Sequence, residues 1–201
     1  GLTFNNFSLK NLFKGEAYRP LPKGDGQKLS LRGQTNGKYY QSYSFSFSEP
    51  WFGGKKPVSF GVSAFTSLQS NGLSKSNVDY YGIRLNGVSF SLGRKLKWPD
   101  NWFSLVHSIN LNQYVLNNYP GYFFSTGESY NLNITQEIAR DSRNHHIFPT
   151  GGAYLRFTIQ ATPPYSLLNN VNYATASEKQ RYKFTEYHKS KYEAKFLETV
   201  G

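Results

Sequence analysis

The sequence has 201 residues, a formal net charge of +11 and 17% aromatic residues, and it contains no cysteine. The lack of cysteine excludes a disulfide framework, a thiolate metal site and a cysteine nucleophile. No apolar run exceeds three residues, which excludes a transmembrane helix and a signal-peptide core from this stretch. The basic residues are scattered through presumed turns and alternating segments, so we expect no nucleic-acid partner.

Extended segments with a period of two follow one another along the chain. Residues 43–48 read Tyr-Ser-Phe-Ser-Phe-Ser, which places every aromatic side chain on one face of a strand and every serine on the other. Turn-forming residues separate the segments, and Asn36-Gly37 predicts a tight hairpin. The predicted strands are residues 2–13, 27–36, 38–49, 57–69, 78–93, 101–116, 127–140, 151–162 and 181–198, and no segment has helical periodicity.

The predicted strands are longer than those of soluble sheets, which have roughly five or six residues. A bilayer requires tilted strands of about nine to eleven residues, and longer strands project beyond it. The connections also alternate between short ones, such as 36–37 and 98–101, and longer ones rich in Ser, Asn and Gly. Both features are typical of a membrane β-barrel.

We predict that one face of these strands is apolar throughout and the other polar throughout. In a soluble β-sandwich two apolar faces meet in a dry core, whereas in an outer-membrane barrel the apolar face meets lipid and the polar face lines a wet lumen. Long polar side chains at alternating positions favour the wet lumen, namely Arg84, Asn86, Asn110, Asn112, Glu137, Arg156 and Gln160.

The predicted fold is therefore all-β, an antiparallel transmembrane β-barrel of the outer-membrane type, present as an incomplete barrel of about nine strands. The alternative of a different class is a soluble β-sandwich that binds carbohydrate through its aromatic residues.

No pattern in the sequence predicts catalysis, a cofactor or a bound metal. His145 and His146 lie near Asp141, but adjacent residues of an extended chain point to opposite faces, and no third ligand has suitable spacing. His107 falls on the apolar face without a nucleophile motif near it. We therefore expect a protein that is not an enzyme and has no catalytic, cofactor-binding or metal-binding residue.

Two regions of the chain resemble the BamA family of outer-membrane protein assembly factors. Residues 39–52, Tyr-Tyr-Gln-Ser-Tyr-Ser-Phe-Ser-Phe-Ser-Glu-Pro-Trp-Phe, look like an early hairpin of the family that ends in an acidic or polar residue, Pro, an aromatic residue and Phe. Residues 140–152, Arg-Asp-Ser-Arg-Asn-His-His-Ile-Phe-Pro-Thr-Gly-Gly, are similar to a mid-barrel turn of the family. The resemblance implies these structural site residues: Glu49, Pro50, Trp51, Phe52, Asp141, Arg143, Phe148, Pro149, Thr150 and Gly151.

The second region also has a physical interpretation of its own. Asp141 and Arg143 can pair in the turn, and Phe148 can anchor at the membrane interface. Pro149 sets the turn, and the glycines at 151 and 152 relax the backbone before the next strand. An ordinary hairpin loop without a family role is the alternative interpretation.

The resemblance covers nearly the whole chain but only part of the family's architecture. The family's POTRA repeats are not visible, and its Arg-Gly-Phe loop has no match, since Arg32-Gly33 is followed by Gln34. We therefore expect residues 1–201 to be part of one transmembrane β-barrel domain, without the POTRA repeats and the C-terminal half of the barrel. The match runs from roughly the second to the tenth strand of the family's barrel.

By this resemblance, the expected function is the folding and insertion of other outer-membrane proteins through a lateral seam in the bacterial outer membrane, without catalysis. The implied partners are outer-membrane lipid, nascent outer-membrane protein clients and the accessory lipoproteins of an assembly complex. A two-partner secretion transporter or a porin-like channel is the alternative within the same class of barrels.

Overall fold

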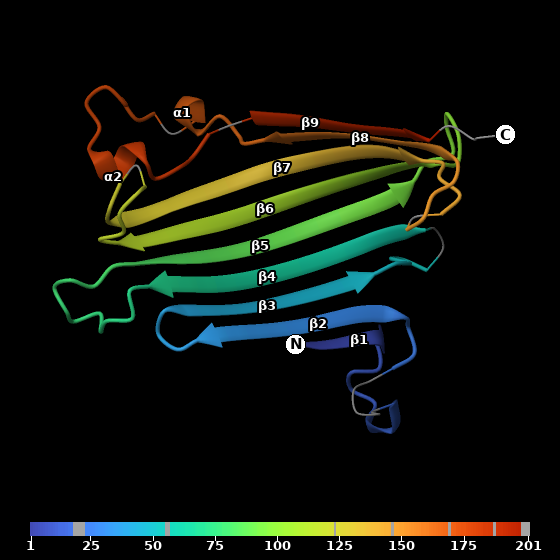
Figure 1. Cartoon of the computed structure of the whole chain (residues 1–201), viewed down its shortest axis with the longest axis horizontal. Helices are drawn as coiled ribbons and strands as arrows, with labels where there is room; N and C mark the ends of the chain where they lie inside the picture. Colours follow the sequence, from blue (N-terminus) through green and yellow to red (C-terminus); the bar gives the residue numbers. More distant parts are fainter. Residues whose placement is uncertain are drawn as a thin grey trace.

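Nine strands form one antiparallel sheet in the computed structural model, which describes residues 1–17, 23–54, 57–122, 124–145, 147–168, 170–186 and 188–197. The strands are β1 (Leu2–Phe7), β2 (Gln27–Asn36), β3 (Tyr40–Glu49), β4 (Val58–Ser70), β5 (Gly82–Lys95), β6 (Phe103–Asn117), β7 (Gly127–Asp141), β8 (Gly152–Ala161) and β9 (His188–Leu197). Each strand pairs with its neighbours in sequence, so the sheet is an up-and-down meander with β1 and β9 at its edges (Figure 1). The two edges do not pair with each other among the described residues, so the sheet is unclosed.

The described residues of the connections include three short helical turns. They are the 3₁₀ turn η1 (Gly15–Ala17), α1 (Tyr165–Leu168) and α2 (Glu178–Arg181). No helix in the described part of the chain has the length and hydropathy of a membrane span.

The first and last strands are shorter than the sequence predicts. β1 ends at Phe7 because Ser8 starts a turn, in which its Oγ accepts a bond from the Asn11 N–H at 3.1 Å and donates one to Asp25 at 2.6 Å. β9 begins at His188, not at residue 181, because residues 178–181 form α2. The helices α1 and α2 are also absent from the prediction, since single turns carry no detectable period.

The connections confirm one prediction and contradict another. Residues 37–39 join β2 to β3 in a tight hairpin with Gly37 at φ +57°, as the Asn36-Gly37 pair predicts. The regular alternation of short and long connections is not found, because the short connections 37–39 and 96–102 lie at opposite ends of the sheet.

In the described part of the chain, the sheet is a single layer without a dry apolar core. Among the described residues only four apolar side chains are buried, namely Phe7, Tyr80, Leu116 and Ala139. A β-sandwich requires a second sheet against the apolar face, and all nine strands belong to one sheet. The sandwich alternative is therefore not the architecture of the described residues.

Candidate functional site

The cross-strand register sorts the side chains onto two faces, because directly opposite residues of an antiparallel pair point the same way. We call one the apolar face, and one of its transverse rows, from β3 to β7, is Phe47, Val62, Phe90, Ile109 and Ile134. We call the other the polar face, and its matching row is Ser46, Ser63, Ser89, Asn110 and Asn133.

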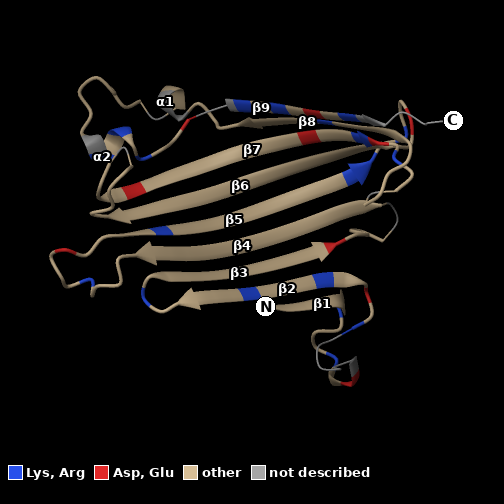
Figure 2. Cartoon of the chain, in the orientation of Figure 1, with Lys and Arg blue, Asp and Glu red and all other residues tan. Residues whose placement is uncertain are grey.

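The apolar face leaves large side chains uncovered. The most exposed of those in the middle strands are between 45% and 51% exposed: Phe90, Leu92, Ile109, Leu111 and Ile134. Charged residues gather near the strand ends and on the outer strands, and β4 and β6 contain none (Figure 2). A continuous exposed apolar surface of this kind requires an apolar solvent or a partner.

The faces are less uniform than the sequence predicts. Arg84 and Asn86 do not lie on the polar face. They alternate along β5 with the polar-face residues and point to the same side as Val88 and Phe90. The remaining lumen candidates do lie on the polar face: Asn110, Asn112, Glu137, Arg156 and Gln160. His107 lies on the apolar face, as predicted, opposite Leu92 on β5.

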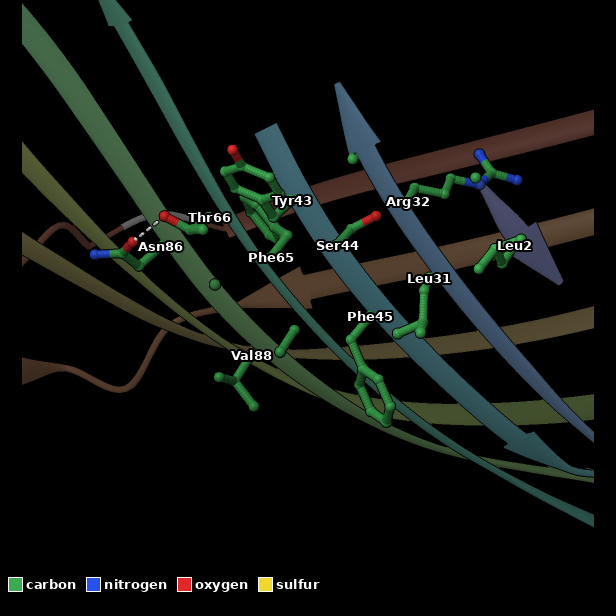
Figure 3. Close-up of a pocket in the computed structure, with 14 residues that line it drawn as sticks. Leu2, Leu31, Arg32, Tyr43, Ser44, Phe45, Phe65, Thr66, Asn86 and Val88 are labelled. Carbon is green, nitrogen blue, oxygen red and sulfur yellow. Dashed lines mark hydrogen bonds between the residues drawn. The ribbon is translucent and has the colours of Figure 1, made fainter. Parts of the chain in front are cut away.

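A row of polar side chains borders the apolar face toward the β4–β5 and β6–β7 connections. Thr66 Oγ1 donates to Asn86 Oδ1 at 2.7 Å, and Tyr43 lies opposite Thr66 on β3 (Figure 3). Asn86 Nδ2 donates to Gln113 Oε1 at 3.0 Å, and Gln113 Nε2 donates to the Tyr130 hydroxyl at 3.2 Å. These bonds satisfy polar groups beside an apolar band, which indicates that the band ends at this row.

A buried amide network ties strands together on the polar face. Asn133 is 1% exposed, and its Oδ1 accepts bonds from Asn110 Nδ2 and Gln160 Nε2, each at 2.8 Å. Its Nδ2 donates to Asn131 Oδ1 at 2.8 Å, and Asn131 Nδ2 donates to Thr185 Oγ1 at 2.9 Å. The network therefore joins β6, β7, β8 and the segment before β9.

The first family-like turn, Glu49 to Phe52, connects β3 to β4. The Phe52 N–H donates to the Val58 carbonyl at 2.8 Å, and the Phe52 and Phe60 rings lie 4.9 Å apart. Trp51 and Phe52 are 56% and 49% exposed. The turn therefore presents two aromatic side chains at the end of the sheet, directly after Pro50.

The second family-like turn begins with an ion pair. Arg143 donates to the Asp141 carboxylate from Nε at 2.8 Å and from Nη2 at 2.7 Å, so the pair predicted from the sequence is present and bidentate. This hydrogen bonding raises the pKa of Arg143. The Arg143 guanidinium also lies 4.6 Å from the centre of the Tyr154 ring.

Asn144 holds the rest of this turn. Its Nδ2 donates to Thr150 Oγ1 at 2.6 Å, and its Oδ1 accepts the Thr150 N–H at 3.0 Å and the Gly151 N–H at 3.3 Å. Gly152, with φ +100°, is the position that requires glycine, because an added Cβ would lie 2.8 Å from the Arg143 Cα. The sequence therefore identified the glycine pair but not which member is essential.

The tip of the second turn is open to its surroundings. Phe148 is 82% exposed, and Pro149 follows it directly. The meander places the β3–β4, β5–β6 and β7–β8 connections at one end of the sheet, on the right in Figure 1. The structure therefore brings both family-like turns to the same end and places the β5–β6 connection between them.

A salt bridge that the sequence analysis missed joins the β5–β6 connection to β7. Asp100 Oδ2 accepts from Arg140 Nε at 2.9 Å, and Asp100 Oδ1 accepts the Trp102 N–H at 2.9 Å. Desolvation acts to raise the pKa of Asp100, but the bonds from Trp102 and Arg140 outweigh it, and the pKa is lowered. The sequence predicts only a short connection at 98–101, because the partner of Asp100 is forty residues away.

Metal-binding groups do not gather anywhere in the described part of the chain, where no three His, Asp or Glu side chains could hold an ion. Of the adjacent histidines, His146 lies outside the described residues.

Comparisons with known proteins identify the architecture. Residues 23–197 match the sequence model of the Omp85 superfamily domain. The crystal structure of BamA from Haemophilus ducreyi lacking POTRA domains 1–3 matches with a TM-score of 0.50 and 22% identity, over 71% of this chain and 29% of that chain. The chain therefore spans less than a third of the length of that structure, and the likeness concerns the fold. No curated protein sequence gives a significant match.

Proposed function

Because the chain belongs to the Omp85 superfamily of outer-membrane barrels, we propose that it forms part of the wall of a factor that folds other outer-membrane proteins and inserts them into the bacterial outer membrane. The factor acts without catalysis, by opening a lateral seam whose strand edges pair with client strands. Its partners are outer-membrane lipid, nascent client proteins and accessory lipoproteins.

The observation that carries this proposal is the difference between the two faces of the sheet. The exposed apolar face suits hydrocarbon, and the polar face with its amide network suits a wet lumen. An open sheet edge in lipid would leave backbone groups unpaired at a cost of several kcal/mol each, so the edges at β1 and β9 need pairing partners in the proposed barrel.

We further propose that the two family-like turns set this wall at the membrane surface. Trp51, Phe52 and Phe148 are exposed aromatic side chains at one end of the sheet, where such residues anchor a barrel among lipid headgroups. The Asp141–Arg143 ion pair stabilises the second turn where it leaves β7. Glu49, Pro50, Pro149, Thr150 and Gly151 shape the two turns and have no chemical role.

A reconstituted folding assay tests the function. The full-length protein is placed in liposomes, a urea-unfolded eight-stranded outer-membrane barrel is added as client, and its folded fraction is followed by heat-modified mobility on gels. We expect faster client folding than in empty liposomes. No acceleration, together with swelling of the liposomes in small sugars, would instead support the porin-like alternative.

A matched pair of variants tests the second turn. Asp141→Asn removes the carboxylate that pairs with Arg143, and Asp79→Asn removes one from a connection at the opposite end of the sheet. We expect Asp141→Asn to slow client folding while the barrel itself stays folded, and Asp79→Asn to have no effect. Equal rates in the two variants would contradict a role for this turn.

A further inference from the structure

A groove lined by hydroxyl groups and two cations lies on the polar face of β1 to β4. Its volume is about 580 Å³, and its polar lining includes Lys28, Arg32, Ser42, Ser44, Ser46 and Ser63. Phe45, Ala64 and Phe65 also line it. Lys28 and Arg32 are exposed on β2, and no Asp or Glu lines the groove. Arg32 and Ser44 project from the neighbouring strands β2 and β3 (Figure 3).

The hydroxyl groups of this groove are available to a solute. In the part of the chain that the structure describes, the Ser44, Ser46 and Ser63 hydroxyls have no hydrogen-bond partner in the protein, whereas those of Thr3 and Ser30 bond each other at 3.1 Å. A hydroxyl group donates to an oxyanion, and a neighbouring Lys or Arg strengthens the contact by its charge.

The acids of the polar face do not offset this charge, because each is already paired. Glu137 lies 2.9 Å from Arg156, and Glu193 lies 3.0 Å from Lys195. Asp141, at the end of β7, is held by its neighbour in the turn at 2.7 Å. Among the described residues, Lys28 and Arg32 have no carboxylate within ion-pair distance.

We propose that the polar face is an anion-attracting wall and that the groove at Lys28 and Arg32 binds small oxyanions in preference to cations. The inference rests on the proposed function, since only in a barrel does this face line a water-filled lumen. Walls of low dielectric constant concentrate the potential of the two cations within the lumen. Lys28 and Arg32 contribute two of the positive charges behind the net charge of +11, and the groove assigns them a function.

Charged thiol reagents measure this potential directly. Ser63→Cys places one thiol at the groove, in a stretch that has no other cysteine. The full-length variant in liposomes is treated with an anionic sulfonatoethyl and with a cationic trimethylammonium-ethyl methanethiosulfonate. The rate with the anionic reagent is divided by the rate with the cationic reagent, and this ratio is divided by the same ratio for a free thiol. The ionised fraction of the cysteine cancels in this ratio, so the ratio reports the local potential alone.

We expect a normalised ratio above one for Ser63→Cys, and a fall of about threefold when Lys28→Gln and Arg32→Gln are added, given two unit charges partly screened by salt. The matched control is Arg94→Gln, which removes one positive charge from the apolar face and should leave the ratio unchanged.

The outcomes separate the two proposals. A ratio at or below one, or a ratio that the double variant does not lower, overturns the anion-attracting wall but leaves the barrel intact. Resistance of the thiol to both reagents would mean that the polar face is not wet, and that result counts against the proposed function itself.

Discussion

An arginine placed on the apolar face should cost stability in proportion to its depth in the bilayer. Ile109 lies near the middle of β6, between Phe90 and Ile134, and is 50% exposed. A charged residue at the midplane of an outer-membrane barrel costs about 2–4 kcal/mol, and the cost falls to about 0–1 kcal/mol near the interfaces. We expect Ile109→Arg to lower the free energy of unfolding by about 2–4 kcal/mol.

The structure supplies two comparisons on the same strand. Leu105 shares the apolar face and lies four residues from Ile109, which is about 14 Å along the strand and about 10 Å in depth at a tilt of roughly 40°. Leu105→Arg should therefore cost about 1 kcal/mol. Ser108 points to the polar face, so Ser108→Arg should change stability by no more than about 0.5 kcal/mol.

The assay is reversible urea unfolding of the full-length protein in vesicles, followed by tryptophan fluorescence and extrapolated linearly to water. The order of the stability losses in the three variants is a sharper test than any single value of the free energy of unfolding. Equal losses at Ile109 and Ser108, or a larger loss at Leu105 than at Ile109, would refute the assignment of this face to hydrocarbon.

Three further predictions concern the turns and the amide network, each with the same unfolding assay. Gly152→Ala should cost about 2 kcal/mol or more, because the backbone has positive φ and the added Cβ would meet the backbone of Ser142 and Arg143. Gly121→Ala, at φ +90° with open space around it, should cost about 1 kcal/mol; similar losses in the two variants would exclude the close approach at Gly152. Asn133→Ala should cost about 1–3 kcal/mol, since it leaves buried amide groups without partners, and an unchanged midpoint would show that water replaces the side chain. The lowered pKa of Asp100 means that its contribution to stability is present above the ordinary value of 3.8 and is lost as pH falls through the lowered value. Asp100→Asn should therefore destabilise the protein at pH 7 and match the unchanged protein in strong acid, and a constant difference at all pH values would contradict this.

The sequence by itself determined where most of the strands lie along the chain. Alternation of side chains is a local property of the backbone, so segments such as 43–48 revealed extended structure without knowledge of any partner. The Asn36-Gly37 pair determined its hairpin for the same reason, because the positive φ of Gly37 is a requirement of that one residue. The pairing of Asp141 with Arg143 was also predictable, since only one residue separates them.

Only the tertiary structure decided which residues share a face across strands and which distant groups pair. Arg84 and Asn86 were assigned to the wrong face, because a polar residue in an alternating strand can belong either to the lumen or to the border of the apolar band. The Asp100–Arg140 bridge depends on the register of β6 with β7 and on the path of the β5–β6 connection, which no local pattern encodes. The need for glycine at Gly152 arises in the same way, because the atoms that exclude a side chain belong to Ser142 and Arg143 on the opposite arm of the turn.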